Sequence, residues 1–472
     1  METRLLYVTN ENLPALREAS KDICVIPMGC VEKHGLHGPL GADIIIARTM
    51  SRKKTRIFLA GMKKPKKDGN MKKIELLMDR VGSSKWPQRW ETFFDEVEAD
   101  FLANGTVYTD PDYYQDLHDR LGILNTYLPL YKQAAHEIGK NKDLTLFLAL
   151  LCRALQDREY HDEDIEQFSA PKRSDSAPDL AYDMLTALAV ASEAEMCYTL
   201  LQERKLPKEH VEYVMNLPEN GVDYYQMRYG RPGYCLLDWY QLAIDCKLFR
   251  LGRLELQIFH SFGGRVQVFE GPRGQRVALA HDITAHRSGR ALGSLYCDDK
   301  ESSHICAVCE TEDSWVGYPV NEAGLIESVA ITLPKREWKQ VLKRGDNVVS
   351  LHIPAGGGLT PEAVDESIQQ MKVFLRTYFP DYEYKAFDCY SWLLDPQLVT
   401  LLGEDTNISK FCKRFSPVTH HSRGEAVFNF VFFKPNMDFD MKSLPENTNL
   451  EKKLKEHFLN GNAIYETYGY FF

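Results

Sequence analysis

Residues 348–361 combine a short apolar run, three glycines and a helix-start signal. The run 348–353 is typical of a buried strand, and Pro354 ends it. Thr360 lies where an N-cap belongs, with Pro361 at the first helical position. The first N–H groups of a helix have no partner within the helix and carry partial positive charge. A glycine loop just before them lets an anion such as a pyrophosphate approach the backbone closely.

The residues predicted to contact this anion are Gly356, Gly357, Gly358, Leu359 and Thr360. An alternative stays open, because the loop has neither a P-loop lysine nor a full GxGxxG pattern. On that alternative the glycines form a turn that only joins a strand to a helix. Apolar residues recur at helical spacing from 364 to 378, and residues 384–394 read as the next strand.

The composition is that of an ordinary soluble protein of two or three domains. The chain has 472 residues, of which 44% are hydrophobic. Its net charge of −10 argues against a general nucleic-acid binder, which needs a basic face. No apolar run approaches the roughly 18 residues that span a membrane, so we expect no membrane partner. Eleven scattered cysteines fit reduced thiols, and therefore a cytoplasmic location.

Secondary-structure patterns divide the rest of the chain. Residues 51–73 are rich in Lys and Arg and read as a basic linker. Residues 74–246 carry apolar residues at helical spacing, and we expect an all-α domain. Strand signals follow at 249–259, 266–269, 275–281, 304–308 and 328–332, then short helices at 396–402 and 407–415. A final strand is expected at 426–433, followed by a C-terminal helix and tail over 436–472.

The segment 25–43 resembles the opening metal-binding segment of the creatininase family of amidohydrolases. The shared residues are Gly29, Glu32, His34, Gly35, His37, Pro39, Leu40 and Asp43. The resemblance implies that Glu32, His34 and Asp43 are divalent-metal ligands, and carboxylates with an imidazole suit Zn²⁺ or Mn²⁺. It covers about the first 50 residues, and the family's later NGHGGN-type loop is absent. We therefore expect a vestigial fragment, with metal-dependent amide hydrolysis as the alternative function.

The segments FRLGRLELQ, LHIPAGGGLTPEAVDESI, FPDYEYKAFDCYSWLLDPQL and NISKFCKRF resemble a bacterial two-part acyltransferase family over residues 72–435. That family has a helical N-acyltransferase N-terminal domain and a GNAT-like C-terminal domain. The resemblance implies acyl transfer from acetyl-CoA or another acyl-CoA to an amine on a small molecule or a peptide. In such folds two central strands splay apart, the pantetheine arm lies between them, and the pyrophosphate caps the following helix.

Mapped onto this chain, the splayed pair consists of 348–353 and 384–394, with the phosphates at 356–360. His352 is a candidate general base, or it hydrogen-bonds the loop. Tyr390 or Ser391 is a candidate acid for the departing thiolate, and Asp395 is either catalytic or an N-cap. Arg253 is a candidate phosphate ligand, or it forms a salt bridge.

The sequence thus predicts an α+β protein, with an all-α domain followed by a GNAT-like mixed sheet that has helices on both faces. The expected domains are a creatininase-like fragment (1–50), a linker (51–73), a helical domain (74–246), a GNAT-like domain (247–435) and a C-terminal helix and tail (436–472). The predicted function is acyl-CoA-dependent N-acyl transfer. The open alternatives are a metal amidohydrolase and a non-catalytic GNAT-fold binding protein.

Overall fold

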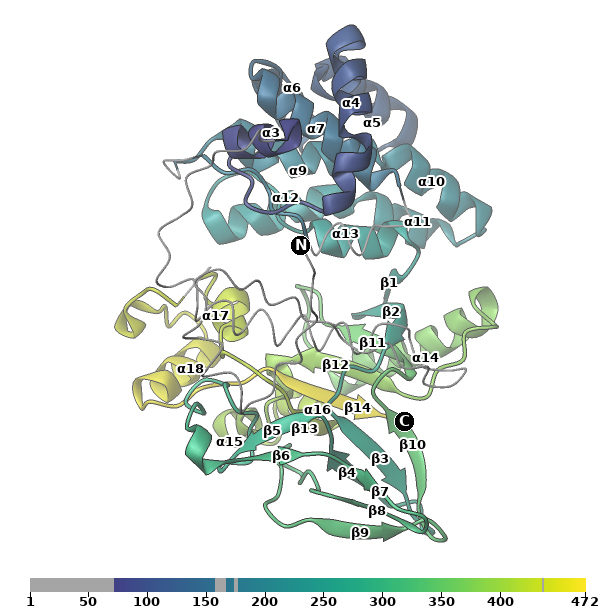
Figure 1. The fold of residues 1–472 in the computed structure, drawn as a ribbon, viewed down its shortest axis with the longest axis vertical. Helices are drawn as coiled ribbons and strands as arrows, with labels where there is room; N and C mark the ends of the chain where they lie inside the picture. The colour runs from purple at the N-terminus through teal and green to yellow at the C-terminus, as the bar shows by residue number, and fades with distance from the viewer. Residues whose placement is uncertain (1–71, 158–166, 174–176, 435–436) are drawn as a thin grey trace, which may run out of the picture. The chain divides into compact units, whose positions relative to one another are not determined.

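The computed structural model describes residues 72–157, 167–173, 177–434 and 437–472, in which a helical part is followed by a part built on β-sheets (Figure 1). This confirms the predicted α+β class and the order of its two parts. The creatininase-like fragment and almost all of the linker, residues 1–71, lie outside the described residues.

The helical part runs from Lys73 to Ile244. Its helices are α3 (Lys73–Val81), α4 (Glu91–Asn104), α5 (Pro111–Leu121), α6 (Leu128–Gly139), α7 (Lys142–Leu155), α9 (Leu180–Ser192), α10 (Ala194–Glu203), α11 (Lys208–Met215), α12 (Leu217–Tyr229) and α13 (Leu237–Ile244). Side-chain caps set several of the starts. Asn141 accepts hydrogen bonds from the amides of Asp143 and Leu144 at the start of α7, and Asp179 accepts one from Ala181 at the start of α9.

Helix α9 is the central helix of this part. Its residues from Met184 to Ala191 are all buried. Among the described residues, the stretch Leu180–Glu203 has the length and apolar character of a membrane span, but 72% of its most apolar window is buried inside the protein. Burial of this kind is typical of the core helix of a globular domain.

The second part is built on a six-stranded mixed sheet with the order β1-β2-β11-β12-β14-β13. Its strands are β1 (Leu248–Leu251), β2 (Leu254–Ser261), β11 (Asn347–His352), β12 (Phe387–Ser391), β13 (Ser416–Thr419) and β14 (Thr467–Phe471). Smaller sheets are formed by β3 (Val266–Glu270), β4 (Arg276–Ala280) and β10 (Lys339–Lys343), by β5 (Ile283–His286) and β6 (Ser303–Cys306), and by β7 (Cys309–Glu310), β8 (Ser314–Gly317) and β9 (Ile331–Pro334). β11 and β12 are parallel, and the other pairs in the large sheet are antiparallel.

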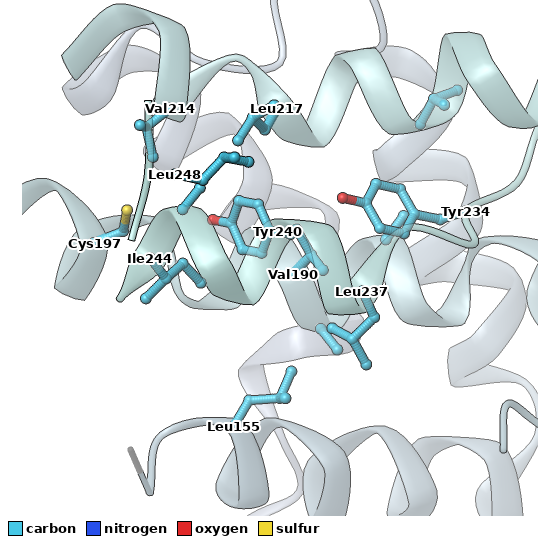
Figure 2. Packing of buried hydrophobic residues seen from close by; sticks show 14 of the residues in the cluster. Leu155, Val190, Cys197, Val214, Leu217, Tyr234, Leu237, Tyr240, Ile244 and Leu248 are labelled. Atoms are coloured by element: carbon cyan, nitrogen blue, oxygen red, sulfur yellow. The ribbon is translucent and has the colours of Figure 1, made fainter. Parts of the chain in front are cut away.

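The hydrophobic core is continuous from the helical part into the sheet. Leu248 of β1 belongs to the same buried cluster as Tyr240 and Ile244 of α13 (Figure 2). Alternation along the strands gives the large sheet two faces. One face, which carries Leu351 and Phe387, packs into this cluster with the buried side of α14 (Pro361–Tyr378).

Residues 426–433 were predicted to be the last strand of the sheet, and this prediction is wrong. Ala426–Val431 forms helix α17, and Phe428 packs against Phe458 of α18 (Asn449–Leu459) with ring centroids 4.7 Å apart. A short apolar run fits a buried helix as well as a buried strand, and here packing against α18 decides. The segment 436–472 does contain the expected helix, but its last residues form β14, between β12 and β13.

Candidate active site

The glycine loop has the local structure that its sequence predicts. β11 ends at His352, and α14 begins at Pro361 with Thr360 as its N-cap, whose hydroxyl accepts from the Ala363 amide at 3.3 Å. Residues 356–358 are exposed to solvent. Gly356 has φ +109°, a conformation that other residues rarely adopt, and Cβ atoms added at Gly356 or Gly357 would contact nothing within 4 Å.

Arg253 of the β1–β2 hairpin fixes the shape of this loop. Its guanidinium donates to the carbonyl oxygens of Pro354 (2.8 Å), Gly357 (2.8 Å) and Gly356 (3.3 Å). Because a trans peptide places N–H and C=O on opposite sides, the amides that follow these carbonyls point away from Arg253. Those amide groups belong to residues 355, 357 and 358. Exposed backbone donors at these positions, beside the N-terminus of α14, suit a phosphate group.

β11 and β12 separate next to this loop. They pair only at Val349–Phe387 and Ser350–Asp388. β11 continues to His352 while it remains paired with β2, and β12 continues to Ser391 while it remains paired with β14. Beyond Ser350 and Asp388 the facing edges of the two strands are therefore unpaired with each other. Their peptide groups can pair with an extended guest chain, as in strand addition.

A β-bulge in β2 determines which way His260 points. Gln257 pairs with Ser350, but His260 pairs with Val348, so β2 has one more residue than β11 across this step. The extra residue lies at Phe259, which has φ +54°. Without the bulge, alternation would turn His260 to the opposite face of the sheet. With it, His260 lies on the same face as Ser350.

We call this side the polar face. It carries, on the four central strands, Glu255, Gln257, His260, Ser350, His352, Asp388, Tyr390 and Tyr468.

At the centre of the polar face, Asp388 lies between His260 and Tyr468. Its Oδ2 is 3.9 Å from His260 Nε2 and accepts a hydrogen bond from Tyr468 Oη at 2.5 Å. Asp388 is fully buried, and its Oδ1 has no hydrogen-bond partner among the described residues. Burial raises the pKa of Asp388, while His260 and Tyr468 oppose the increase. The side chain of His260 is 33% exposed, so it is the member of this group that a substrate can reach.

His352 has a different environment. Its Nε2 is 2.8 Å from Gln257 Oε1, and its ring lies edge-on to Trp239 of α13 at 4.5 Å. Burial lowers the pKa of His352 to about 3, and His260 adds to the decrease. A histidine in this state is a poor proton acceptor near neutral pH, which argues against a role as general base. Its hydrogen bond goes to Gln257 of β2 and not to the glycine loop, so the predicted bond to the loop is not seen.

The helical part reaches the polar face through α11 and α13. Tyr213 of α11 donates a hydrogen bond to the Glu255 carboxylate, which is 5% exposed and faces His352 across the β2–β11 pair. Burial raises the pKa of Glu255, although hydrogen bonds from Tyr213 and Trp239 oppose the increase. Both parts of the chain therefore contribute to the environment of this site.

The other predicted acids, Tyr390, Ser391 and Asp395, have different environments. Tyr390 is 42% exposed on the polar face, and burial of its hydroxyl raises its pKa, so the group stays protonated at neutral pH. Ser391 instead caps the short helix Trp392–Leu394 by accepting from the Leu393 amide. Asp395 is fully buried, and its oxygens accept from the amides of Gln397 and Tyr465. Ser391 and Asp395 thus have structural partners, and the helix Gln397–Leu402 that follows Asp395 has Pro396 as its N-cap.

His260, Asp388 and Tyr468 were not found from the sequence. His260 depends on the bulge, and Tyr468 lies in a strand that the sequence left as a tail. Asp388 is the lone carboxylate in an otherwise apolar strand, and this is the one sequence signal that marks it as a candidate. The predicted metal ligands Glu32, His34 and Asp43 lie outside the described residues, so their role stays a prediction. Within the described ranges, no group of three or more His, Cys, Asp or Glu could hold a metal.

Comparisons with known proteins agree with the fold. The sequence model of the GNAT-like C-terminal domain matches residues 248–471, and that of creatinine amidohydrolase matches residues 8–64. No curated protein matches the chain.

Solved structures with a similar fold are acyltransferases. One in complex with decanoyl-CoA and teicoplanin has a TM-score of 0.51 and 17% identity. One with decanoyl-CoA alone has a TM-score of 0.52 and 17% identity, and one with CoA and 10C-teicoplanin has 0.52 and 18%. Each match covers 84% of this chain and 98% of the other. The chain therefore resembles these acyltransferases in its two-part fold, its residues 248–471 match the model of the GNAT-like C-terminal domain, and its N-terminal segment matches part of the creatininase model.

Proposed function

We propose that this protein is an acyl-CoA-dependent N-acyltransferase. The observation that carries the proposal is the separation of β11 and β12 beyond Ser350 and Asp388, directly beside the glycine loop. The pantetheine arm has amide groups of its own and fits the open strand edges as an extra strand. The diphosphate then reaches the amides of residues 355, 357 and 358 and the N-terminus of α14. The crystallisation of structural neighbours with decanoyl-CoA and with CoA supports this choice of co-substrate.

The transfer needs a base, a binding site for the oxyanion and an acid. His260 takes a proton from the acceptor ammonium or from the attacking amine, and Asp388 with Tyr468 holds the imidazole in place. The amine nitrogen forms a bond to the thioester carbon, and backbone N–H groups in the slot stabilise the negative oxygen. The carbon–sulfur bond then breaks, and the thiolate of CoA takes a proton from Tyr390 or from water, which regains one from the nitrogen of the new amide. No covalent enzyme intermediate is required.

The acceptor is proposed to be an amine on a small molecule or a peptide-like compound. A structural neighbour was crystallised with teicoplanin, which supports an acceptor of this class. A cytoplasmic setting remains part of the proposal and is supported by the eleven cysteines scattered along the chain, a pattern typical of reduced thiols.

Calorimetry with acetyl-CoA, octanoyl-CoA and decanoyl-CoA, followed by thiol-release assays on a panel of amines, tests the proposal. We expect binding of at least one acyl-CoA and amine-dependent release of free CoA. A His260→Gln variant should bind the acyl-CoA as the wild type does and release CoA at least about 100-fold more slowly. Binding without transfer to any amine would favour a binding protein, and no binding would contradict the coenzyme site.

The creatininase-like match at residues 8–64 motivates one competing activity, metal-dependent amide hydrolysis. Full-length protein and its Glu32→Gln variant can be assayed for creatinine hydrolysis with Zn²⁺ or Mn²⁺ present. We expect no hydrolysis by either protein and equal acyl transfer by both. Metal-dependent hydrolysis that the variant loses would overturn this expectation and assign the segment a function.

A further inference from the structure

Two arginines lie at the end of β11 that is opposite the glycine loop. Arg344 belongs to the turn between β10 and β11, and Arg265 follows the end of β2. The two segments are tied together, because the Phe262 amide donates to the Asp346 carbonyl (2.8 Å) and the Gly345 amide donates to the Phe262 carbonyl (3.0 Å). The glycine loop starts only after the whole length of β11. These arginines are therefore separate from the proposed diphosphate site.

The two guanidinium groups share a single carboxylate. Arg265 Nη1 is 3.0 Å and Arg344 Nη1 is 3.1 Å from the same oxygen, Asp282 Oδ2. The cluster thus keeps one positive charge in excess. The Arg265 and Arg344 side chains are 35% and 54% exposed, so a ligand can reach them. Paired guanidinium groups favour carboxylate and phosphate oxygens, because their planar N–H donors match the geometry of these anions.

This arginine pair adjoins the polar face. The Gly263 amide, two residues before Arg265, donates to Tyr468 Oη at 2.9 Å, and the same Oη donates to Asp388. The His420 ring lies 5.0 Å from that of Tyr390 and 6.2 Å from that of Tyr468. Burial lowers the pKa of His420, and the neighbouring positive charges of Arg265 and Arg344 contribute to the decrease.

These contacts define a path across the polar face. The coenzyme enters from the glycine loop, and the proposed base and the aromatic rings lie further on. The arginine pair stands beyond them, on the side from which the coenzyme does not come. An acceptor whose amine meets the thioester therefore extends toward Arg265 and Arg344.

We propose that the acceptor amine carries an anionic oxygen group, a carboxylate or a phosphate, which Arg265 and Arg344 bind. This inference rests on the proposed acyl transfer and adds the chemical class of the acceptor. The exposed ring of Tyr390, next to that of His420, offers an aromatic surface on which a spacer can stack. Amino acids, peptides with a nearby carboxylate and aminoalkyl phosphates belong to this class, and simple alkylamines do not.

Matched amines test the charge preference. The probes are 6-aminohexanoate against hexylamine, and 3-aminopropylphosphonate against propylamine, each with the acyl-CoA that binds best. We expect kcat/KM to be at least about 10-fold higher for the anionic member of one pair, mainly through KM, and the preference to shrink as salt is raised. A preference in the first pair indicates that the bound group is a carboxylate, and a preference in the second pair indicates a phosphate. Equal kcat/KM within both pairs would overturn the inference.

Substitutions of the two arginines test whether they cause this preference for anionic amines. Arg265→Gln and Arg344→Gln should each reduce the ratio of anionic to neutral kcat/KM at least about fivefold. Arg336→Gln, which changes an 82% exposed arginine paired with Glu337, is the matched control and should leave the ratio unchanged. The ratio is insensitive to the fraction of folded enzyme, because misfolding lowers both rates equally. An unchanged ratio in both test variants would refute the assignment.

Calorimetry of the same amines with the CoA-bound protein separates this inference from the proposed reaction. Tighter binding of the anionic amine without any turnover would contradict the acyl transfer and support the anion site. Turnover of both amines with equal binding would support the transfer and contradict the anion site. Neither binding nor turnover would contradict both.

Discussion

Gly357 offers a clean test of the glycine loop, because its position accepts a side chain sterically. A Cβ there would contact nothing within 4 Å, and its φ lies outside the left-handed region. In Gly357→Asp the new carboxylate lies roughly 6 Å from an anion on the neighbouring amides. With an effective dielectric constant of about 40–80, each unit charge then costs about 0.7–1.4 kcal/mol. For a diphosphate with about two charges, CoA should bind about 10- to 100-fold more weakly.

Calorimetry with CoA at about 0.05 M and 0.5 M salt measures this effect. Gly357→Ala is the steric control and should bind CoA within about twofold of the wild type. The loss in Gly357→Asp should diminish at high salt, where the Debye length falls below the separation of the charges. If Gly357→Asp and Gly357→Ala bound CoA equally at low salt, the loop would be only a turn and the reasoning would fail.

The remaining predictions concern the surroundings of this loop. Arg253→Ala should weaken CoA binding about 10-fold in calorimetry, because three loop carbonyls lose their donor; unchanged affinity would show that the loop holds its shape alone. Asp388→Asn should lower kcat in the thiol-release assay at least about 10-fold with little change in CoA affinity, and an unaltered kcat would remove Asp388 from the mechanism. The pKa of His352 is lowered to about 3 in the folded protein, whereas in the unfolded chain it is about 6.5. As pH falls below about 6.5, the His352 imidazole therefore binds a proton in the unfolded chain but not yet in the folded protein. Folding stability is therefore lost from about pH 6.5 downward, and His352→Gln should reduce the loss between pH 7 and pH 5 by about 1–2 kcal/mol in urea unfolding; an identical loss in both proteins would contradict this environment. Gly469→Ala should destabilise the protein by about 1–3 kcal/mol in the same assay, because its Cβ would lie 2.7 Å from a leucine methyl and 2.8 Å from a phenylalanine Cβ, and a neutral result would show that the sheet relaxes there.

Local signals explain what the sequence alone could predict. Thr360 and Pro361 define the start of α14 through their own chemistry, and the structure confirms both positions. Short apolar runs between turns likewise gave β11 and β12, although β12 is shorter than expected and gives way to a short helix at Trp392. These features depend on residues within one turn or one strand, so a single sequence contains the information.

The rest of the site depends on contacts between distant segments. His260 reaches the polar face only because β2 gains a residue against β11, and the sequence of β2 does not mark that bulge. Residues 426–433 satisfy helix and strand patterns equally, and packing against α18 decides between them. Tyr468 is in the site because the end of the chain inserts between β12 and β13, a pairing that no local pattern specifies.

The bulge at Phe259 also connects backbone strain to function. A non-glycine residue at φ +54° costs about 1–2 kcal/mol relative to an extended conformation. Phe259 packs against Phe379 and Tyr382, with ring centroids 6.1 Å and 4.9 Å away, and these contacts offset part of that cost. The strained residue immediately precedes His260, so the conformation that stores strain is the one that orients the proposed base.

The most direct test of this account is the position of CoA in a crystal of the full-length protein. The account predicts that the pantetheine arm lies between β11 and β12 and hydrogen-bonds their facing edges. It also predicts phosphate oxygens within hydrogen-bond distance of the amides of residues 357 and 358. A structure in which CoA binds elsewhere, with the space between these two strands unoccupied, would contradict it.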